Sequence, residues 1–480
     1  MAVIVLGYFA VLLLVARITK GKSSDNENFF LGGRKSPWMV VAFGMIGASL
    51  SGVTFVSVPG WTMSIDMTYM QTVIGFFFGY IFIARVLLPL YYRLQLTSIY
   101  SFIKGRLGIR SYKSAASFFI LSKIIGAAAR LYIVTTILQK FVFDYWNIPY
   151  VVTAAVILGL IWAYTFQGGI KTIVWTDMLQ TFCMLGALVM IMVCIAQHMH
   201  LSPSGMVNTV AESPHFRIFD WDWHSPQFFW KQFISGIFIT IAMSGLDQDM
   251  MQKNLSCRSL KEAKKNMYWY GSAFIPVNFL FLSLGVLLVA LAQSKGIALP
   301  ERGDDLLPMF AATGYLGDAT LIFFTLGIIA AAFSSADSAL TALTTSFCID
   351  ILGIEQKEVA EAKKTRMAVH LGITGCFIII MLLFNVLNIS SIINSIYQIA
   401  SYTYGPLIGL FAFGLFTKRA TLDKAVPFIC IVSPLLCFAV EKTVTTFTDY
   451  KFGYELILAN GFITFAGLWL FSKKSKPIWK

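Results

Sequence analysis

Apolar segments long enough to cross a lipid bilayer follow one another along almost the whole of this sequence. A spanning helix needs about 20 mostly apolar residues, and inside the membrane its backbone must satisfy its own hydrogen bonds. The sequence shows no barrel-type alternation, so each segment is predicted to be a helix. Thirteen spans are predicted, at residues 2–18, 37–60, 68–92, 114–139, 149–167, 172–197, 228–247, 268–293, 317–349, 367–386, 390–416, 425–440 and 454–472. The first is expected to be a retained helix, because no small-residue cleavage site follows it.

The charged residues support the same fold class, an all-α integral membrane protein. Only 13% of the residues are charged and 57% are hydrophobic, whereas about 25% of a soluble chain is charged. The net charge of +13 would suit a nucleic-acid-binding protein, but the positions of the basic residues argue against it. On one side of the predicted membrane the loops, including 248–267, hold 27 of the 37 lysines and arginines. By the positive-inside rule, the N-terminus is predicted outside and the C-terminus in the cytoplasm.

Motifs of catalysis and of metal binding are missing from the sequence. The seven cysteines form no CxxC pair, the five histidines form no HExxH motif, and no phosphate-binding GxxxxGK[ST] loop occurs. We therefore expect no enzyme, no organic cofactor and no nucleotide-driven pump.

Residues 37–60 contain an unusual run of small and hydroxylated residues at the middle of a predicted span. Between Gly47 and Thr54 lie Ser49, Ser51 and a second glycine, Gly52. Glycine weakens a helix, and hydroxyl groups can bind freed carbonyls or a ligand. Two interpretations stay open: a broken helix at a midplane binding site, or close helix packing through small residues.

A second polar face occurs within 317–349. Ala331, Ser334, Asp337, Ser338 and Thr341 share one side of the predicted helix by their spacing. Oxygen ligands with a single carboxylate suit sodium better than calcium, whose sites usually gather several carboxylates. Hydrogen bonding between helices is the alternative, but an aspartate inside a span costs about 2.5–3.5 kcal/mol on insertion, which favours a function for Asp337.

Two further charged residues lie inside predicted spans. Asp177 is either an intramembrane acid or an acid at the cytoplasmic interface. Arg130 has two open roles: it could bind a substrate anion with both arms of its guanidinium group, or it could pair with Asp177 or Asp337. The Gly75–Gly79 pair is expected to serve helix packing.

Four motifs in the same order resemble those of one transporter family. They are Asn28-Phe29-Phe30-Leu31-Gly32-Gly33-Arg34 with Trp38, Gly168-Gly169-Ile170-Lys171 with Trp175-Thr176-Asp177 and Gln180, Asp247-Gln248 with Gln252 and Leu255-Ser256, and Ala263-Lys264-Lys265. Together they resemble the sodium:solute symporters, which include sodium–glucose, sodium–proline and sodium–sialic acid transporters. The likeness covers about 1–472. Asn28 stands where that family usually has Asp, and Lys253 where it usually has Arg.

The resemblance implies a leucine-transporter-type fold in a single transmembrane domain, 1–480. Its expected parts are a leading helix at 2–18, two inverted five-helix repeats at 37–197 and 228–416, and two trailing helices within 425–472. In that fold, 37–60 and 228–247 would be a pseudo-symmetric pair of broken helices.

The resemblance also implies where cations bind. A shared sodium site would use the carbonyls of Gly47, Leu50 and Ala331 and the hydroxyls of Ser334 and Ser335. Some members hold a second cation, which here would lie among Asp177, Asp337 and Ser338. Position 337 is expected to be Ser, and its replacement by Asp leaves open a tighter second site, a proton-coupled site or a pair with Arg130.

The implied solute site resembles the sialic-acid branch more than the glucose branch. In that branch, hydroxyls matching Ser49, Ser51 and Thr54 bind a carboxylate with help from an arginine on the next long helix. Arg130 lies on the matching helix, about one turn further along. The other expected wall residues are Tyr69, Gln71, Thr240 and Ser244.

The predicted function is a sodium-coupled secondary active symporter that imports a small polar organic solute, such as a sugar acid or another organic anion, by alternating access. A neutral sugar or an amino acid is the alternative solute, and a solute-binding sensor or an ion channel is the alternative class. We expect one or two sodium ions, a plasma-membrane location, lipid as the surrounding medium, no nucleic-acid partner and a monomer.

Overall fold

The computed structural model describes residues 2–19, 26–312, 314–387, 392–448, 450 and 452–474. The predicted loop lysines Lys20 and Lys22, the outer Lys451 and the basic tail 475–480 lie outside these residues. Within the described residues the fold is almost wholly helical, apart from one short two-stranded sheet in which β1 (Arg419–Thr421) pairs antiparallel with β2 (Ser472–Lys474).

The helical elements follow the predicted spans with a few interruptions. In the first half of the chain they are α1 (Ala2–Thr19), α2 (Asn26–Leu31), η1 (Gly32–Arg34), α3 (Trp38–Ser49), α4 (Gly52–Ile65), α5 (Tyr69–Phe82), η2 (Ile83–Leu87), α6 (Leu88–Arg93), α7 (Ser101–Arg106), α8 (Ile109–Leu138), η3 (Gln139–Phe143), η4 (Asp144–Trp146), α9 (Tyr150–His198) and α10 (Pro203–Ala211). In the second half they are α11 (Phe229–Thr240), η5 (Ile241–Gly245), α12 (Gln248–Leu255), α13 (Leu260–Lys295), η6 (Gly303–Asp305), α14 (Leu306–Ala312), α15 (Asp318–Ser346), η7 (Phe347–Ile351), η8 (Ile354–Gln356), α16 (Val359–Leu387), α17 (Ile392–Phe416), α18 (Val426–Phe447) and α19 (Leu456–Leu470).

Among the described residues, eight helices are long and apolar enough to cross a membrane. Two bent helix pairs pass the same test together, and three shorter apolar helices lie at Gly7–Thr19, Tyr150–Phe166 and Leu456–Leu470. The chain is therefore a multi-pass membrane protein. The count of thirteen spans stays a prediction, because the shorter helices fall below the length that a full crossing needs.

Both predicted broken helices are bent. The chain turns by 56° between α3 and α4 and by 66° between η5 and α12. At the second bend, the freed carbonyls of Gly245 and Leu246 accept hydrogen bonds from the hydroxyls of Tyr91 and Tyr100, at 3.0 and 2.9 Å. Tyrosine side chains therefore replace the helical partners that the bend removes.

The boundary predicted after residue 247 is wrong. The sequence predicts a cytoplasmic loop at 248–267, but residues 248–255 form α12, the second half of the bent span, and all of them are buried. This helix is polar in sequence, with Asp247 as its N-cap, so its hydropathy alone indicated a loop. Lys253, counted with the loop charges, is therefore inside the protein.

Glycine allows the helices around the centre to approach closely. An added Cβ on Gly47 would lie 2.1 Å from the Thr181 hydroxyl, so α3 can contact α9 only without a side chain there. Gly75 and Gly236 play the same part between α5 and α11, where an added Cβ would lie 2.2–2.3 Å from a backbone oxygen of the other helix. The packing role expected for the Gly75–Gly79 pair agrees with this contact.

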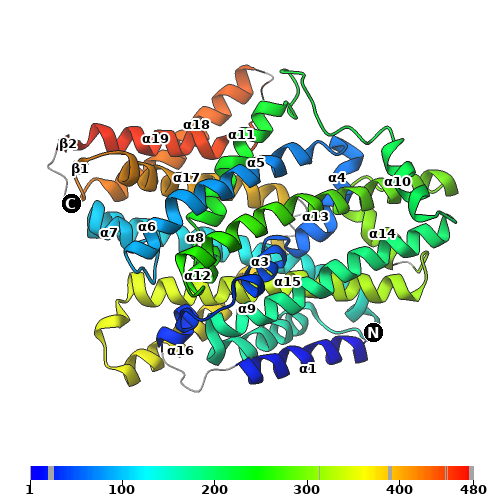
Figure 1. Cartoon of the computed structure of the whole chain (residues 1–480), viewed down its shortest axis with the longest axis horizontal. Helices are drawn as coiled ribbons and strands as arrows, with labels where there is room; N and C mark the ends of the chain where they lie inside the picture. The colour runs from blue at the N-terminus through cyan, green and yellow to red at the C-terminus, as the bar shows by residue number, and fades with distance from the viewer. Residues whose placement is uncertain are drawn as a thin grey trace.

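The two predicted spans at 149–167 and 172–197 are joined without a loop. They form α9, which changes direction at Gly169, where φ is +55°. An added Cβ at Gly169 would lie 2.4 Å from the Phe29 carbonyl oxygen, so α2 packs directly against the kink. In Figure 1, α1 lies on one side of the molecule beside α9, and α18 and α19 lie on the opposite side. Between them, α3, α9, α12 and α15 meet at the centre.

Candidate functional site

A cavity of about 150 Å³ lies where the two bent helices face α8 and α15. Most of the predicted solute-binding residues line it: Ser49, Ser51, Thr54, Tyr69, Arg130, Thr240 and Ser244. They come from α3, α4, α5, α8, α11 and the π-helical turn η5, so segments far apart in sequence build one chamber. Phe76 and Phe274 add apolar walls to a chamber that is otherwise lined by many polar side chains.

Gln71 is the predicted wall residue that does not reach the cavity. Its side chain is fully buried, donates to the Gln227 carbonyl at 2.8 Å and accepts from the Asp220 backbone N–H at 3.0 Å. The nitrogen and the oxygen of the Gln71 side-chain amide are thus both used to hold the segment before α11, and neither faces the cavity.

Tyrosines that the sequence did not single out extend the polar wall. The hydroxyl of Ser49 lies 2.5 Å from the Tyr270 hydroxyl, which lies 2.7 Å from the Tyr80 hydroxyl. This chain of hydroxyls fixes the Ser49 side chain beside the break between α3 and α4. Hydroxyl groups both donate and accept, so the chain can adjust to either need of a solute.

The first break also leaves backbone carbonyls free next to α15. α3 ends at Ser49, so its last carbonyls lack helical partners. The Ser335 hydroxyl lies 3.4 Å from the Ala48 carbonyl oxygen and 3.3 Å from that of Ala331. Of the five predicted sodium ligands, Ser335 therefore lies against the broken segment that carries Gly47 and Leu50, and its other contact, the Ala331 carbonyl, is one turn earlier on α15.

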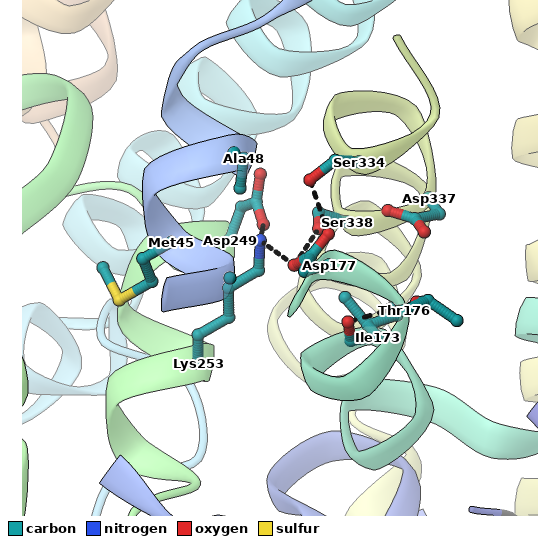
Figure 2. A network of polar contacts seen from close by, with 12 residues as sticks. Met45, Ala48, Ile173, Thr176, Asp177, Asp249, Lys253, Ser334, Asp337 and Ser338 are labelled. Carbon is teal, nitrogen blue, oxygen red and sulfur yellow. Dashed lines mark hydrogen bonds and ion pairs between the residues drawn. The ribbon is translucent and has the colours of Figure 1, made fainter. Parts of the chain in front are cut away.

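Asp177 is a fully buried acid at the junction of α9 and α15. One carboxylate oxygen accepts from the Ser334 hydroxyl at 2.6 Å, and the other is 3.4 Å from the Ser338 hydroxyl. The Lys253 ammonium lies 2.7 Å from that second oxygen, and both residues of this ion pair are at most 1% exposed. Figure 2 shows Lys253 extending from α12 toward Asp177, with Ser334 and Ser338 on the other side of the carboxylate.

Lys253 belongs to a row of alternating charges that starts at the cavity. Asp249, four residues before it on α12, lies 3.8 Å from Lys253 and 2.8 Å from Lys123 of α8. Lys123 also pairs with Asp247 at 3.1 Å, and Asp247 accepts from the Tyr404 hydroxyl at 2.6 Å. α12 is thus joined by ion pairs to α8 on one side and to α9 on the other.

Asp337 lies on the same helix as Ser334 and Ser338 but has different partners. One of its carboxylate oxygens accepts from the Tyr164 hydroxyl at 2.9 Å. The other has no hydrogen-bond partner among the described residues, and the side chain is fully buried. Arg130 forms an ion pair with neither Asp177 nor Asp337 among the described residues. Lys253 pairs with Asp177 instead.

Arg130 is the exception among the basic residues of the cavity. Lys123 is matched by two carboxylates, whereas Arg130 forms no ion pair with any described residue. Its side chain lines the same space as Ser51 and Thr54. A guanidinium group with no carboxylate at ion-pair distance in a partly buried chamber is suited to receive one from a ligand.

Comparison with known proteins shows the family of this chain. The sequence model described as the sodium:solute symporter family matches residues 29–427. The chain belongs to the sodium:solute symporter family. It is a sodium-coupled transporter of a small solute, and not an enzyme.

Individual relatives of this symporter cover nearly its full length. It is 26% identical to the sodium/sialic acid symporter SiaT of Proteus mirabilis over 97% of this chain and 93% of the relative. It is 24% identical to the sodium/sialic acid symporter NanT of Aliivibrio fischeri over 96% and 90%. The fold matches that of a Na+-coupled sialic acid symporter solved in a substrate-bound outward-open state, with a TM-score of 0.84, 24% identity and 99% coverage of both chains.

Besides Tyr80 and Tyr270, the site residues that the sequence did not predict lie on the polar half of the second bent span or face it. Asp249, Lys253 and Tyr404 were not predicted as site residues. The sequence signal that could have indicated them is the cluster of motif residues that begins at Asp247-Gln248, because so many motif residues are unusual in a loop.

Proposed function

We propose that this symporter imports a sugar acid of the sialic-acid type, driven by sodium flowing inward. The observation that carries the proposal is Arg130, the cavity-lining arginine without an ion pair among the described residues. A solute carboxylate would pair with it, and the hydroxyls of Ser49, Ser51 and Thr54 would bind further oxygens. The names of the two bacterial relatives above support the same solute class.

The bend between α3 and α4 supports an anionic solute and a cation side by side. The C-terminal end of α3 carries a partial negative charge, and the N-terminal end of α4 a partial positive one. Ser51 and Thr54, at the start of α4, line the cavity, so a carboxylate there would face the positive end. A sodium ion would face the carbonyl end of α3.

Sodium is proposed to bind between α3 and α15, held by the carbonyls of Gly47, Leu50 and Ala331 and the hydroxyls of Ser334 and Ser335. The free carbonyls at the end of α3 and the position of Ser335 beside Ala48 support this site. Because Ser335 and Ala48 also line the solute cavity, the ion and the solute would share a wall. Binding of either one would then favour the other.

The proposed architecture is the leucine-transporter type, with inverted repeats at 37–197 and 228–416. Its support is the bent helix pair at the start of each repeat, α3 with α4 and α11 with α12. Alternating access would rock the elements around the cavity between these pairs. We place the N-terminus outside and the C-terminus in the cytoplasm of the plasma membrane, and we propose a monomer.

Uptake into proteoliposomes tests the solute and its ligand together. The purified protein should accumulate radiolabelled sialic acid under an inward sodium gradient, and glucose and proline should not accumulate. Arg130→Gln should weaken sialic acid uptake by about 2–5 kcal/mol in apparent affinity, because the carboxylate loses a buried charged partner.

Arg85→Gln is the matched control, because Arg85 also lies inside a spanning segment but is exposed. It should leave sialic acid uptake unchanged. Sodium-driven uptake of glucose or proline that Arg130→Gln does not reduce would refute the anionic solute. Uptake without accumulation would indicate a channel.

A further inference from the structure

The Lys253–Asp177 pair lies where the resemblance to the symporter family puts a second cation. Asp177, Asp337 and Ser338 were expected to surround that cation. In the structure, Asp177 is already paired with the Lys253 ammonium at 2.7 Å, and Ser338 approaches the same carboxylate oxygen at 3.4 Å. The ammonium is 1% exposed and comes from α12, which is buried throughout.

Both carboxylate oxygens of Asp177 already have partners within the protein. One accepts from Ser334 at 2.6 Å, and the other faces Lys253 and Ser338. A sodium ion placed on this carboxylate would lie next to a buried ammonium, and two positive charges at that range in a low-dielectric interior repel strongly. The position can therefore hold the ammonium or a sodium ion, but not both.

Lys253 is also held in place from its own helix. Asp249 lies 3.8 Å away, one turn earlier on α12, and is itself anchored by Lys123 of α8 at 2.8 Å. Figure 2 shows the ammonium between the carboxylates of Asp249 and Asp177. Because carboxylates on two sides attract the Lys253 ammonium, we expect it to stay in place when sodium is present.

We propose that Lys253 is a resident cation that takes the place of a second sodium ion, so that this symporter binds one sodium ion, at the α3–α15 site, per transport cycle. The inference rests on the proposed sodium coupling and adds to it the number of ions. It gives Asp177 a fixed positive partner, so the second cation of this chain is part of the protein and is not transported.

Counting bound sodium tests the inference without knowledge of the solute. The full-length protein, purified in detergent, would be titrated with radioactive sodium chloride in a choline chloride background, and the bound sodium per protein measured at saturation. The wild type should bind one sodium ion. Lys253→Met should bind two, because the methionine side chain keeps most of the volume and leaves the Asp177 carboxylate uncompensated beside Ser334 and Ser338.

Two further variants serve as controls. Lys253→Arg keeps the charge and should still bind one sodium ion. Lys231→Met removes an ammonium from an ion pair with Glu455 elsewhere in the protein and should also bind one.

Each outcome decides the matter. Two sodium ions in the wild type would overturn the inference and leave sodium coupling intact, and this count needs no variant if Lys253→Met does not fold. A count of one in a folded Lys253→Met protein would also overturn it. No bound sodium in the wild type, together with no sodium-driven uptake, would refute the sodium coupling itself.

Discussion

The contributions of Asp177 and Lys253 to the free energy of unfolding should be strongly coupled, because the two residues form a buried ion pair. At 2.7 Å the Coulomb attraction is about 6 kcal/mol with an effective dielectric constant of about 20. Removing either partner leaves the other charge buried alone, which costs about 3–5 kcal/mol. Asp177→Asn and Lys253→Met should therefore each destabilise the protein strongly, whereas the double variant, which buries no charge there, should recover most of the loss.

Thermal unfolding of the purified protein in detergent, followed by tryptophan fluorescence, measures this cycle. Sodium should be replaced by choline, because an ion that binds only the folded state would shift Tm by itself. A change of 1 kcal/mol shifts Tm by about 2–4 °C in a domain of 150–250 residues and by less in a longer chain. Each single variant should thus lower Tm by several degrees, and the double variant by clearly less than their sum.

Lys357 and Glu361 provide the matched control cycle. Their ion pair is as short, at 2.6 Å, but it is exposed, with Lys357 just before α16 and Glu361 in the first turn of α16. Lys357→Met and Glu361→Gln should show a coupling of only about 0.2–1 kcal/mol, as exposed ion pairs do. Additive losses at Asp177 and Lys253, with no more coupling than at the exposed pair, would refute the reasoning.

Two further predictions concern sodium and pH. Ser335→Ala should raise the sodium concentration for half-maximal thermal stabilisation at least about tenfold, because a ligand to a charged group is worth about 1.5–3 kcal/mol; Ser283→Ala, a buried serine of α13 away from the site, should not change it, and equal values for the two variants would remove Ser335 from the sodium site. Burial raises the pKa of the Asp304 carboxyl in η6 above its ordinary value of 3.8, so folding loses stability as the pH rises through the folded-state pKa. Asp304→Asn should therefore raise Tm at pH 7, with a gain that shrinks as the pH falls and is lost below about 3, where the carboxyl is protonated in both the folded and the unfolded state. A gain independent of pH would point to packing instead.

The sequence predicted the parts of this fold that depend on hydropathy and on hydroxyl-rich interruptions. The apolar runs indicated the spanning helices. The small residues between Gly47 and Thr54 left a broken helix or close packing open, and the structure has a break there between α3 and α4. It failed at residues 248–255, because a buried helix whose charges are all paired has the composition of a loop. Pairing depends on residues of other helices, Asp177 and Lys123 above all, and no local pattern reveals it.

Side-chain direction was the other limit. Tyr69 and Gln71 are two residues apart on α5 and were both expected at the cavity wall, but only Tyr69 reaches it. Residues two apart on a helix face different sides, and Gln71 points to the backbone near Gln227. For Arg130 the sequence left two roles open. The structure pairs Asp177 with Lys253 and not with Arg130, and anion binding by Arg130 stays a proposal.

The row of charges through α12 restricts how this protein can change during evolution. Ion pairs join successive members of this row, which are Lys123, Asp249, Lys253 and Asp177. Loss of any one member therefore removes an ion-pair partner from a buried charge. A penalty of about 3–5 kcal/mol for a stranded charge is a large part of the 5–15 kcal/mol by which a typical protein is stable. Selection should remove most single substitutions along the row. Lineages that alter it should replace two paired residues together, or first acquire an ion that takes the position of the lost charge.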